Sequence, residues 1–117
     1  MRVIRPRPSA RERSRGEIFR GEAYTQPVVD DGAGPRLLEV AFVNGARTKL
    51  HRHTSDQILL IEAGHGVVGT PSEKHEVAAG DVVVIPAGEA HFHGASDGQD
   101  MTHYSVLGAD NQTAVLE

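Results

Sequence analysis

Hydrophobic and polar residues alternate in short runs along most of this chain, from Arg36 to Leu107. Alternation with a period of two is typical of β-strands that bury one face. Clusters of Gly, Pro, Asn, Asp and Ser separate the runs, as they do at tight turns. The pattern predicts strands at Leu37–Val43, Lys49–His53, Gln57–Glu62, Gly66–Gly69, His75–Val77, Asp81–Ile85, His91–Gly94 and Thr102–Leu107. Many short strands with this spacing indicate an all-β protein, either a sandwich or an antiparallel barrel.

Two dipeptides stand out as turn signals between these runs. Asn44-Gly45 is the strongest hairpin signal in the chain, because both residues tolerate a positive φ. Ala63-Gly64 is a second predicted turn. A helical period does not persist for three turns anywhere, and Ala10–Phe19 is only a poor candidate for a helix.

The length of the chain indicates one domain, since 117 residues can bury a core without disulfides. We divide it into an N-terminal arm with Arg and Pro residues at 1–25, a β-barrel at 26–110 and a C-terminal tail at 111–117. Residues 26–35 are rich in turn formers, so we expect a connection there.

Composition narrows the class of partner. Cysteine is absent, which excludes disulfides, thiolate metal sites and cysteine nucleophiles. The formal net charge of −4 disfavours nucleic acids and anionic membranes. Six of the 12 Lys and Arg residues are arginines in the first fifteen positions, but that segment has no aromatic residue for base stacking, so we expect a solvated arm.

No apolar run approaches the about 18 residues of a membrane span, and no secretory signal is recognisable. We therefore expect a cytoplasmic protein.

The candidate chemistry lies in a group of histidines. His51 and His53 are two positions apart on a predicted strand, so their side chains share one face. A short turn returns the chain to Gln57, and His91 follows a Pro-x-Gly turn that can aim it inward. Three imidazoles and one amide oxygen suit a divalent metal ion and leave two positions of an octahedral shell open. An open site favours chemistry over a structural role.

The two blocks that carry these residues are Gly45-x5-His51-x-His53-x3-Gln57-x6-Gly64 and Gly80-x5-Pro86-x-Gly88-x2-His91. They resemble the paired motifs of the cupin superfamily. The resemblance spans about residues 36–107 and implies an antiparallel jelly-roll β-barrel that holds a metal ion, with manganese as our first choice and iron, zinc or nickel as others.

Two positions depart from the cupin motifs. Gln57 stands where the family has Glu, and Ala95 stands where it has Asn. A neutral amide leaves the full charge on the ion, which should lower the pKa of bound water. Gln57 either coordinates the ion or hydrogen-bonds a metal-bound water; we favour coordination.

A narrower resemblance comes from His91-Phe92-His93-Gly94-Ala95 and Met101-Thr102-His103. These segments are similar to manganese-dependent bacterial cupins that include hydroxynitrile lyases. The resemblance implies that His93 and His103 lie near the open metal positions, with His103 as general acid or base. Packing in the core is the alternative for both residues.

The other histidines and the residues beside the candidate ligands are expected on the surface. His65 and His75 fall in turn and edge regions, and Arg52 and Tyr104 point away from the neighbouring histidines.

Three kinds of function are consistent with a β-barrel that holds a metal ion. The first is a metal-dependent enzyme for a small, weakly polar molecule, either a lyase with the ion as Lewis acid or a dioxygenase. The second is a non-catalytic cupin that binds a small molecule, and the third is an assembly protein with a structural metal. We favour the lyase, and we expect a homodimer in which residues before Arg36 add a strand across the partner.

Overall fold

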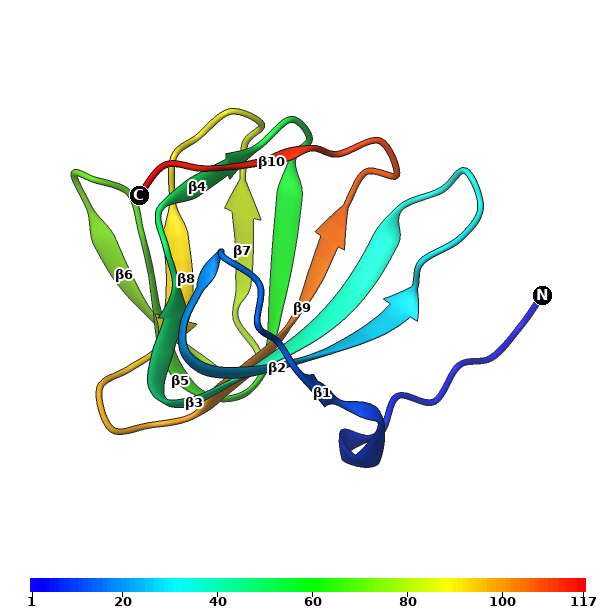
Figure 1. The fold of residues 1–117 in the computed structure, drawn as a ribbon, viewed down its shortest axis with the longest axis horizontal. Coiled ribbons are helices and arrows are strands. Elements are labelled where there is room, and N and C mark those ends of the chain that lie inside the picture. The colour runs from blue at the N-terminus through cyan, green and yellow to red at the C-terminus, as the bar shows by residue number, and fades with distance from the viewer.

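The computed structural model describes all residues from Met1 to Glu117 as one barrel with a short arm (Figure 1). Its elements are a 3₁₀ turn, η1 (Pro8–Ala10), and the strands β1 (Glu12–Arg13), β2 (Phe19–Val29), β3 (Arg36–Thr48), β4 (His51–His53), β5 (Gln57–Gly69), β6 (Lys74–Ala78), β7 (Val82–Ile85), β8 (Phe92–Ala95), β9 (Met101–Leu107) and β10 (Thr113–Val115). No helix in the chain has the length and apolar character needed to cross a membrane. The all-β prediction is confirmed.

The long strand β5 connects four other strands of the barrel, because its two halves pair with different neighbours. Residues 57–60 pair with β7 and residues 57–64 with β9. Residues 65–69 pair with β6 and residues 66–69 with β8. Strand β3 divides in the same way between β9 and β8. All pairs are antiparallel, and the divided pairing of β3 and β5 joins eight strands into the predicted jelly-roll barrel, while β10 and β4 form a separate two-stranded sheet.

The prediction of a hairpin at Asn44-Gly45 is wrong. Both residues have a positive φ, 49° and 78°, but β3 continues through them. The Asn44 N–H donates to Asp100 Oδ1 at 2.8 Å and the Gly45 N–H to the Gln99 carbonyl at 2.9 Å, so the chain bends against the loop before β9 and does not reverse. Here the left-handed conformation makes a corner of the barrel.

The predicted turn at Ala63-Gly64 is also a bend within a single strand. Gly64 has a φ of 80° inside β5, and the register with β9 shifts between Ile61 and Ala63. A side chain at position 64 would collide with the Asp100 carbonyl group. Glycine is required here both for its φ and for this close approach.

The N-terminal region contains a strand that the pattern did not predict. β2 pairs with β3 of the same chain over most of its length, so it crosses the expected boundary at residue 25 and occupies part of the expected connection at 26–35. The placement of this segment across a partner stays a prediction, as does the homodimer itself. At the other end of the chain, β10 pairs with β4.

The interior changes from apolar to polar along the strands. On β5 the inward residues are Gln57, Leu59 and Ile61, and on β9 they are Met101, His103 and Ser105. The apolar cluster consists mainly of aliphatic residues and includes Ala23, Val40, Phe42, Leu59, Ile61, Val68, Val77, Ile85 and Met101. The polar end of this interior is the candidate site.

Candidate metal centre

Seven polar side chains are buried together inside the barrel, each at most 6% exposed. They are His51, His53, Gln57, His91, His93, His103 and Ser105. Strands β4, β5, β8 and β9 supply all but His91, which directly precedes β8. Every residue that the sequence proposed for metal binding or catalysis is therefore in this interior.

The main chain joins His51 to His91. Each residue's N–H donates to the other's carbonyl oxygen at 2.9 Å, and the two ring centroids lie 4.2 Å apart. This single antiparallel bridge brings together two histidines that are distant in sequence.

Hydrogen bonds at Nδ1 set the orientation of these rings. His51 Nδ1–H donates to the Lys49 carbonyl at 2.7 Å, and His91 Nδ1–H donates to the Glu89 carbonyl at 2.8 Å. A carbonyl can only accept, so the proton of each neutral ring is on Nδ1 and the lone pair is on Nε2. Metal-binding histidines are commonly held in this way.

His53 is held by the C-terminal strand. Its Nδ1 lies 2.8 Å from the Thr113 hydroxyl oxygen of β10, and its ring centroid lies 4.9 Å from that of His51. The Nε2 atoms of His51 and His53 are buried and have no hydrogen-bond partner. Buried polar atoms without a partner are rare in proteins, and a bound ion is one explanation for them.

Gln57 faces His91 across the interior. Its Oε1 atom is 3.1 Å from His91 Nε2, and its amide nitrogen donates to Ser105 Oγ at 2.8 Å. The amide oxygen therefore points toward the same space as the imidazole lone pairs.

His93 and His103 form a joined pair behind these residues. His103 Nε2 and His93 Nδ1 are 3.0 Å apart and share one hydrogen bond. The other nitrogen of each ring, His93 Nε2 and His103 Nδ1, is buried without a partner. The His103 ring also packs on Phe42 at a centroid distance of 5.5 Å.

Burial keeps the interior histidines neutral. Desolvation lowers the pKa of His51, His53 and His103 to about 4. It lowers the pKa of His91 and His93 as well. Neutral imidazole is the form that binds metal ions, so these rings are ready to act as ligands at neutral pH.

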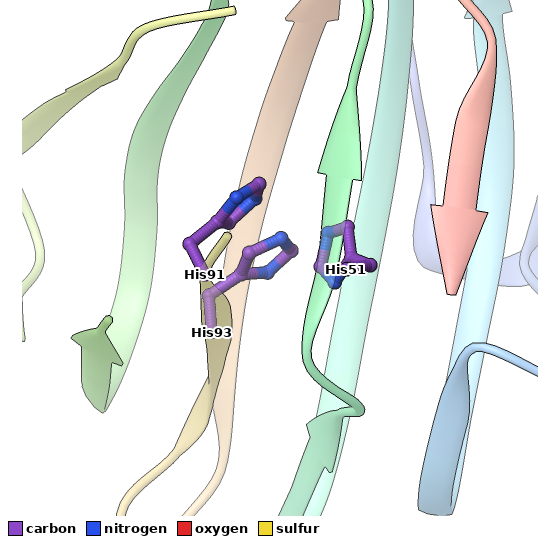
Figure 2. Close-up of side chains that lie close together, drawn as sticks. All are labelled: His51, His91 and His93. Carbon is purple, nitrogen blue, oxygen red and sulfur yellow. The ribbon is translucent and has the colours of Figure 1, made fainter. Parts of the chain in front are cut away.

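The structure adds a residue to the predicted metal group. One nitrogen from each of His51, His91 and His93 lies within 4.8 Å of the other two, whereas His53 is outside this group (Figure 2). Figure 2 shows the nearly parallel rings of His91 and His93 facing the ring of His51. The predicted ligand set of His51, His53, Gln57 and His91 stays a prediction, with His93 as a neighbour near enough to compete for a place in it.

Two surface cavities reach the site. One of about 380 Å³ lies among β5, β6, β7 and β8 and is lined by His91 together with Val68, Val77, Val83, Ile85 and Phe92. The other, of about 550 Å³, is lined by His53 and residues of β10. His93 and His103 line neither cavity.

The surface positions agree with the sequence pattern. His65, His75 and Arg52 are exposed, and Tyr104 is half-buried. The partners Ser105 and Thr113 were not identified from the sequence. The pattern could have indicated Ser105, because it is two residues beyond His103 and so shares its face of the strand. No pattern in the sequence indicates Thr113.

The donor set suits a divalent ion. Neutral imidazole nitrogens and an amide oxygen converge there, and two of these nitrogens lack any other partner. Imidazole ligands suit zinc, copper, iron and nickel, while oxygen ligands suit manganese and magnesium.

Comparison with known proteins agrees with this geometry. Residues 38–107 match the family described as the cupin domain. The (R)-mandelonitrile lyase of Granulicella tundricola is 32% identical over 110 residues, which span 91% of this chain and 83% of that enzyme. The chain belongs to the cupin family. A cupin-like protein from Thermotoga maritima has the same fold, with a TM-score of 0.84 and 26% identity over 89% of this cupin and 83% of that chain. The acireductone dioxygenase of Geobacillus thermodenitrificans is 36% identical over 50 residues, only 38% of this cupin and 28% of that enzyme.

Proposed function

We propose that this cupin is a metal-dependent lyase that cleaves small hydroxynitriles. The observation that carries the proposal is the joined pair of His93 and His103, with one unpartnered nitrogen at each end, beside a cluster of imidazole ligands. The similarity to a mandelonitrile lyase over 91% of the chain supports the same reaction class.

We assign the metal to His51, His53, Gln57 and His91, with manganese as the first choice. A divalent ion supplies a Lewis acid that stabilises negative charge on the substrate oxygen. The four side chains are neutral, so they do not reduce the charge of that ion.

The pair of His93 and His103 is proposed to move the proton. Cleavage takes the hydroxyl proton from the hydroxynitrile, converts the C–O bond to a carbonyl and releases the nitrile carbon with the electron pair of the broken C–C bond. One unpartnered nitrogen accepts the hydroxyl proton. The hydrogen bond between the rings stabilises the protonated pair, and the same nitrogen then returns the proton to cyanide. The products are an aldehyde or ketone and hydrogen cyanide.

The cavity at His91 supports a small, weakly polar substrate. At about 380 Å³ it is at the lower end of the usual range for ligand pockets, and its walls include Val77, Val83 and Phe92. An aromatic or short aliphatic hydroxynitrile is compatible with such walls.

A dioxygenase is the second candidate. It is favoured by the local similarity to acireductone dioxygenase, which covers much less of this chain than the similarity to the lyase. The test is a panel of hydroxynitriles and diketones offered to the manganese- and iron-loaded protein, with release of cyanide and uptake of oxygen measured separately. Cyanide release without oxygen uptake is the expected result, and oxygen uptake alone would replace the lyase by the dioxygenase.

We also propose that the protein is a cytoplasmic homodimer that associates through the outer face of β5 and β7. Ile58, Leu60, Val82 and Val84 are 37%, 40%, 60% and 67% exposed on adjacent strands. The strand register places Ile58 beside Val84 and Leu60 beside Val82, so they form one apolar patch. A two-fold axis would cover the patch with its own copy.

A further inference from the structure

The contact between Gln57 and His91 is a meeting of two hydrogen-bond acceptors. His91 keeps its proton on Nδ1, where the Glu89 carbonyl accepts it at 2.8 Å. Its Nε2 therefore presents a lone pair to Gln57 Oε1, which is 3.1 Å away and also cannot donate. A cation beside both atoms would remove their mutual repulsion.

Reversal of the amide would also remove this repulsion. With the amide turned over, the Gln57 NH₂ would donate to His91 Nε2, and the oxygen would leave the ligand cluster. Whether Gln57 presents oxygen or nitrogen to the cluster therefore depends on what lies at the other end of the amide.

Ser105 lies at that other end. Its Oγ accepts a hydrogen bond from Gln57 Nε2 at 2.8 Å. Gln57 is 3% exposed and Ser105 is 4% exposed, so water is a poor substitute for this partner. A buried NH₂ group without an acceptor is strongly disfavoured.

We infer that Ser105 is a positioning residue whose hydroxyl accepts the Gln57 amide proton and so allows Gln57 to present its oxygen to a divalent ion. The hydroxyl can also donate, so it satisfies the reversed amide in the metal-free protein. Without Ser105, only the reversed amide keeps its NH₂ bonded, and a metal ion must then turn the amide against this preference. The inference rests on the proposed metal site.

The test compares Mn²⁺ affinity in a double-mutant cycle by isothermal titration calorimetry. Ser105→Ala should weaken Mn²⁺ binding by at least about tenfold, because metal binding would leave a buried donor unsatisfied. Ser105→Thr keeps a hydroxyl and should stay close to wild type. In a Gln57→Glu background both side-chain oxygens are acceptors and no orientation has to be chosen. There Ser105→Ala should change the affinity by less than about threefold.

The outcomes separate this inference from the metal site itself. Absence of Mn²⁺ binding by the wild-type protein would overturn the proposed function. Tight binding by Ser105→Ala would overturn the role of Ser105 alone. Equal weakening in both backgrounds would show that Ser105 acts through packing, which also contradicts the inference. If Ser105→Ala does not fold, Ser105→Cys keeps the packing with a weak acceptor and should reduce affinity in the Gln57 background only.

Discussion

His51 and His91 exchange both of their main-chain hydrogen bonds, each 2.9 Å long, and their rings lie 4.2 Å apart. They are 40 positions apart in the chain, so the bridge connects β4 to the residue that precedes β8. The candidate site is thus built on backbone pairing, and the two proposed ligands would need little rearrangement to bind an ion.

Removal of either bridge ligand should release the metal. We expect His51→Ala and His91→Ala to lose most of the Mn²⁺ that the purified wild-type protein carries, because each deletes a neutral imidazole that points into the cluster. His75→Ala is the matched control, since His75 is exposed on β6. Inductively coupled plasma mass spectrometry measures the metal content. Retention of the metal by His51→Ala would show that the ligands are assigned incorrectly.

Exchange of Gln57 for Glu should strengthen metal binding. A carboxylate adds a negative charge beside the ion, so Gln57→Glu should bind Mn²⁺ more tightly and raise the pKa of metal-bound water. Calorimetry and the pH dependence of turnover measure the two effects. If neither quantity changes, Gln57 is not a ligand.

The metal-free protein should lose stability as the pH falls from about 6.5 toward 4. The pKa of His51, His53 and His103 is about 4 in the folded chain against an ordinary value of 6.5. Between these values the unfolded chain binds protons that the folded chain does not, so acid favours unfolding. Each group accounts for up to about 3 kcal/mol across the whole interval.

Thermal unfolding from pH 8 to pH 5 in the presence of EDTA measures this effect. The Tm should be level above pH 7 and fall below it, and His103→Gln should reduce the fall. A Tm that does not change down to pH 5 would contradict the neutral state of the interior histidines.

Loss of His103 should separate turnover from metal binding. The one side-chain hydrogen bond of His103 is to His93, and His103 is not among the proposed ligands, so His103→Ala should keep its metal. Its kcat for a hydroxynitrile should fall by about 10²–10⁴-fold, the usual contribution of a general acid or base. Metal analysis of the same preparation is the control. Full activity with metal present would remove His103 from the mechanism.

A charge in the patch on β5 and β7 should dissociate the proposed dimer. Val84 is 67% exposed, so Val84→Lys should fold normally and sediment as a monomer. Val3→Lys changes a similarly exposed residue of the N-terminal arm and should remain dimeric. Analytical ultracentrifugation distinguishes the two states. A monomeric wild-type protein, or dissociation by Val3→Lys alone, would contradict the proposed interface.

The sequence predicted the strands between Arg36 and Leu107 well, because alternation of buried and exposed residues is a local property, but it did not predict β10. The predicted turns at Asn44-Gly45 and Gly64 are wrong, because a positive φ occurs in bends within a strand as well as in turns. Contact with the loop that supplies Asp100 makes both positions bends, and the sequence does not show that contact. It missed β2, where Gly21 and Pro27 interrupt the pattern and pairing with β3 outweighs local preference.

The candidate site was predicted as a set of residues, but its geometry was not. The parity of His51 and His53 placed both rings inside the barrel, as the structure has them. The approach of His93 to His51 and the hydrogen bond from Gln57 to Ser105 depend on how separate strands come together. No local pattern carries that information.

Anomalous diffraction from crystals grown with Mn²⁺ tests the proposed metal site most directly. We expect a single peak at about 2.1 Å from Nε2 of His51 and His91, a normal metal–imidazole distance, with Gln57 Oε1 as a further ligand. The position of the peak also shows directly whether His53 or His93 is a further ligand. Crystals without a peak between these rings, or with the ion bound elsewhere on the chain, would contradict the claim that this cupin is a metalloprotein with its metal inside the barrel.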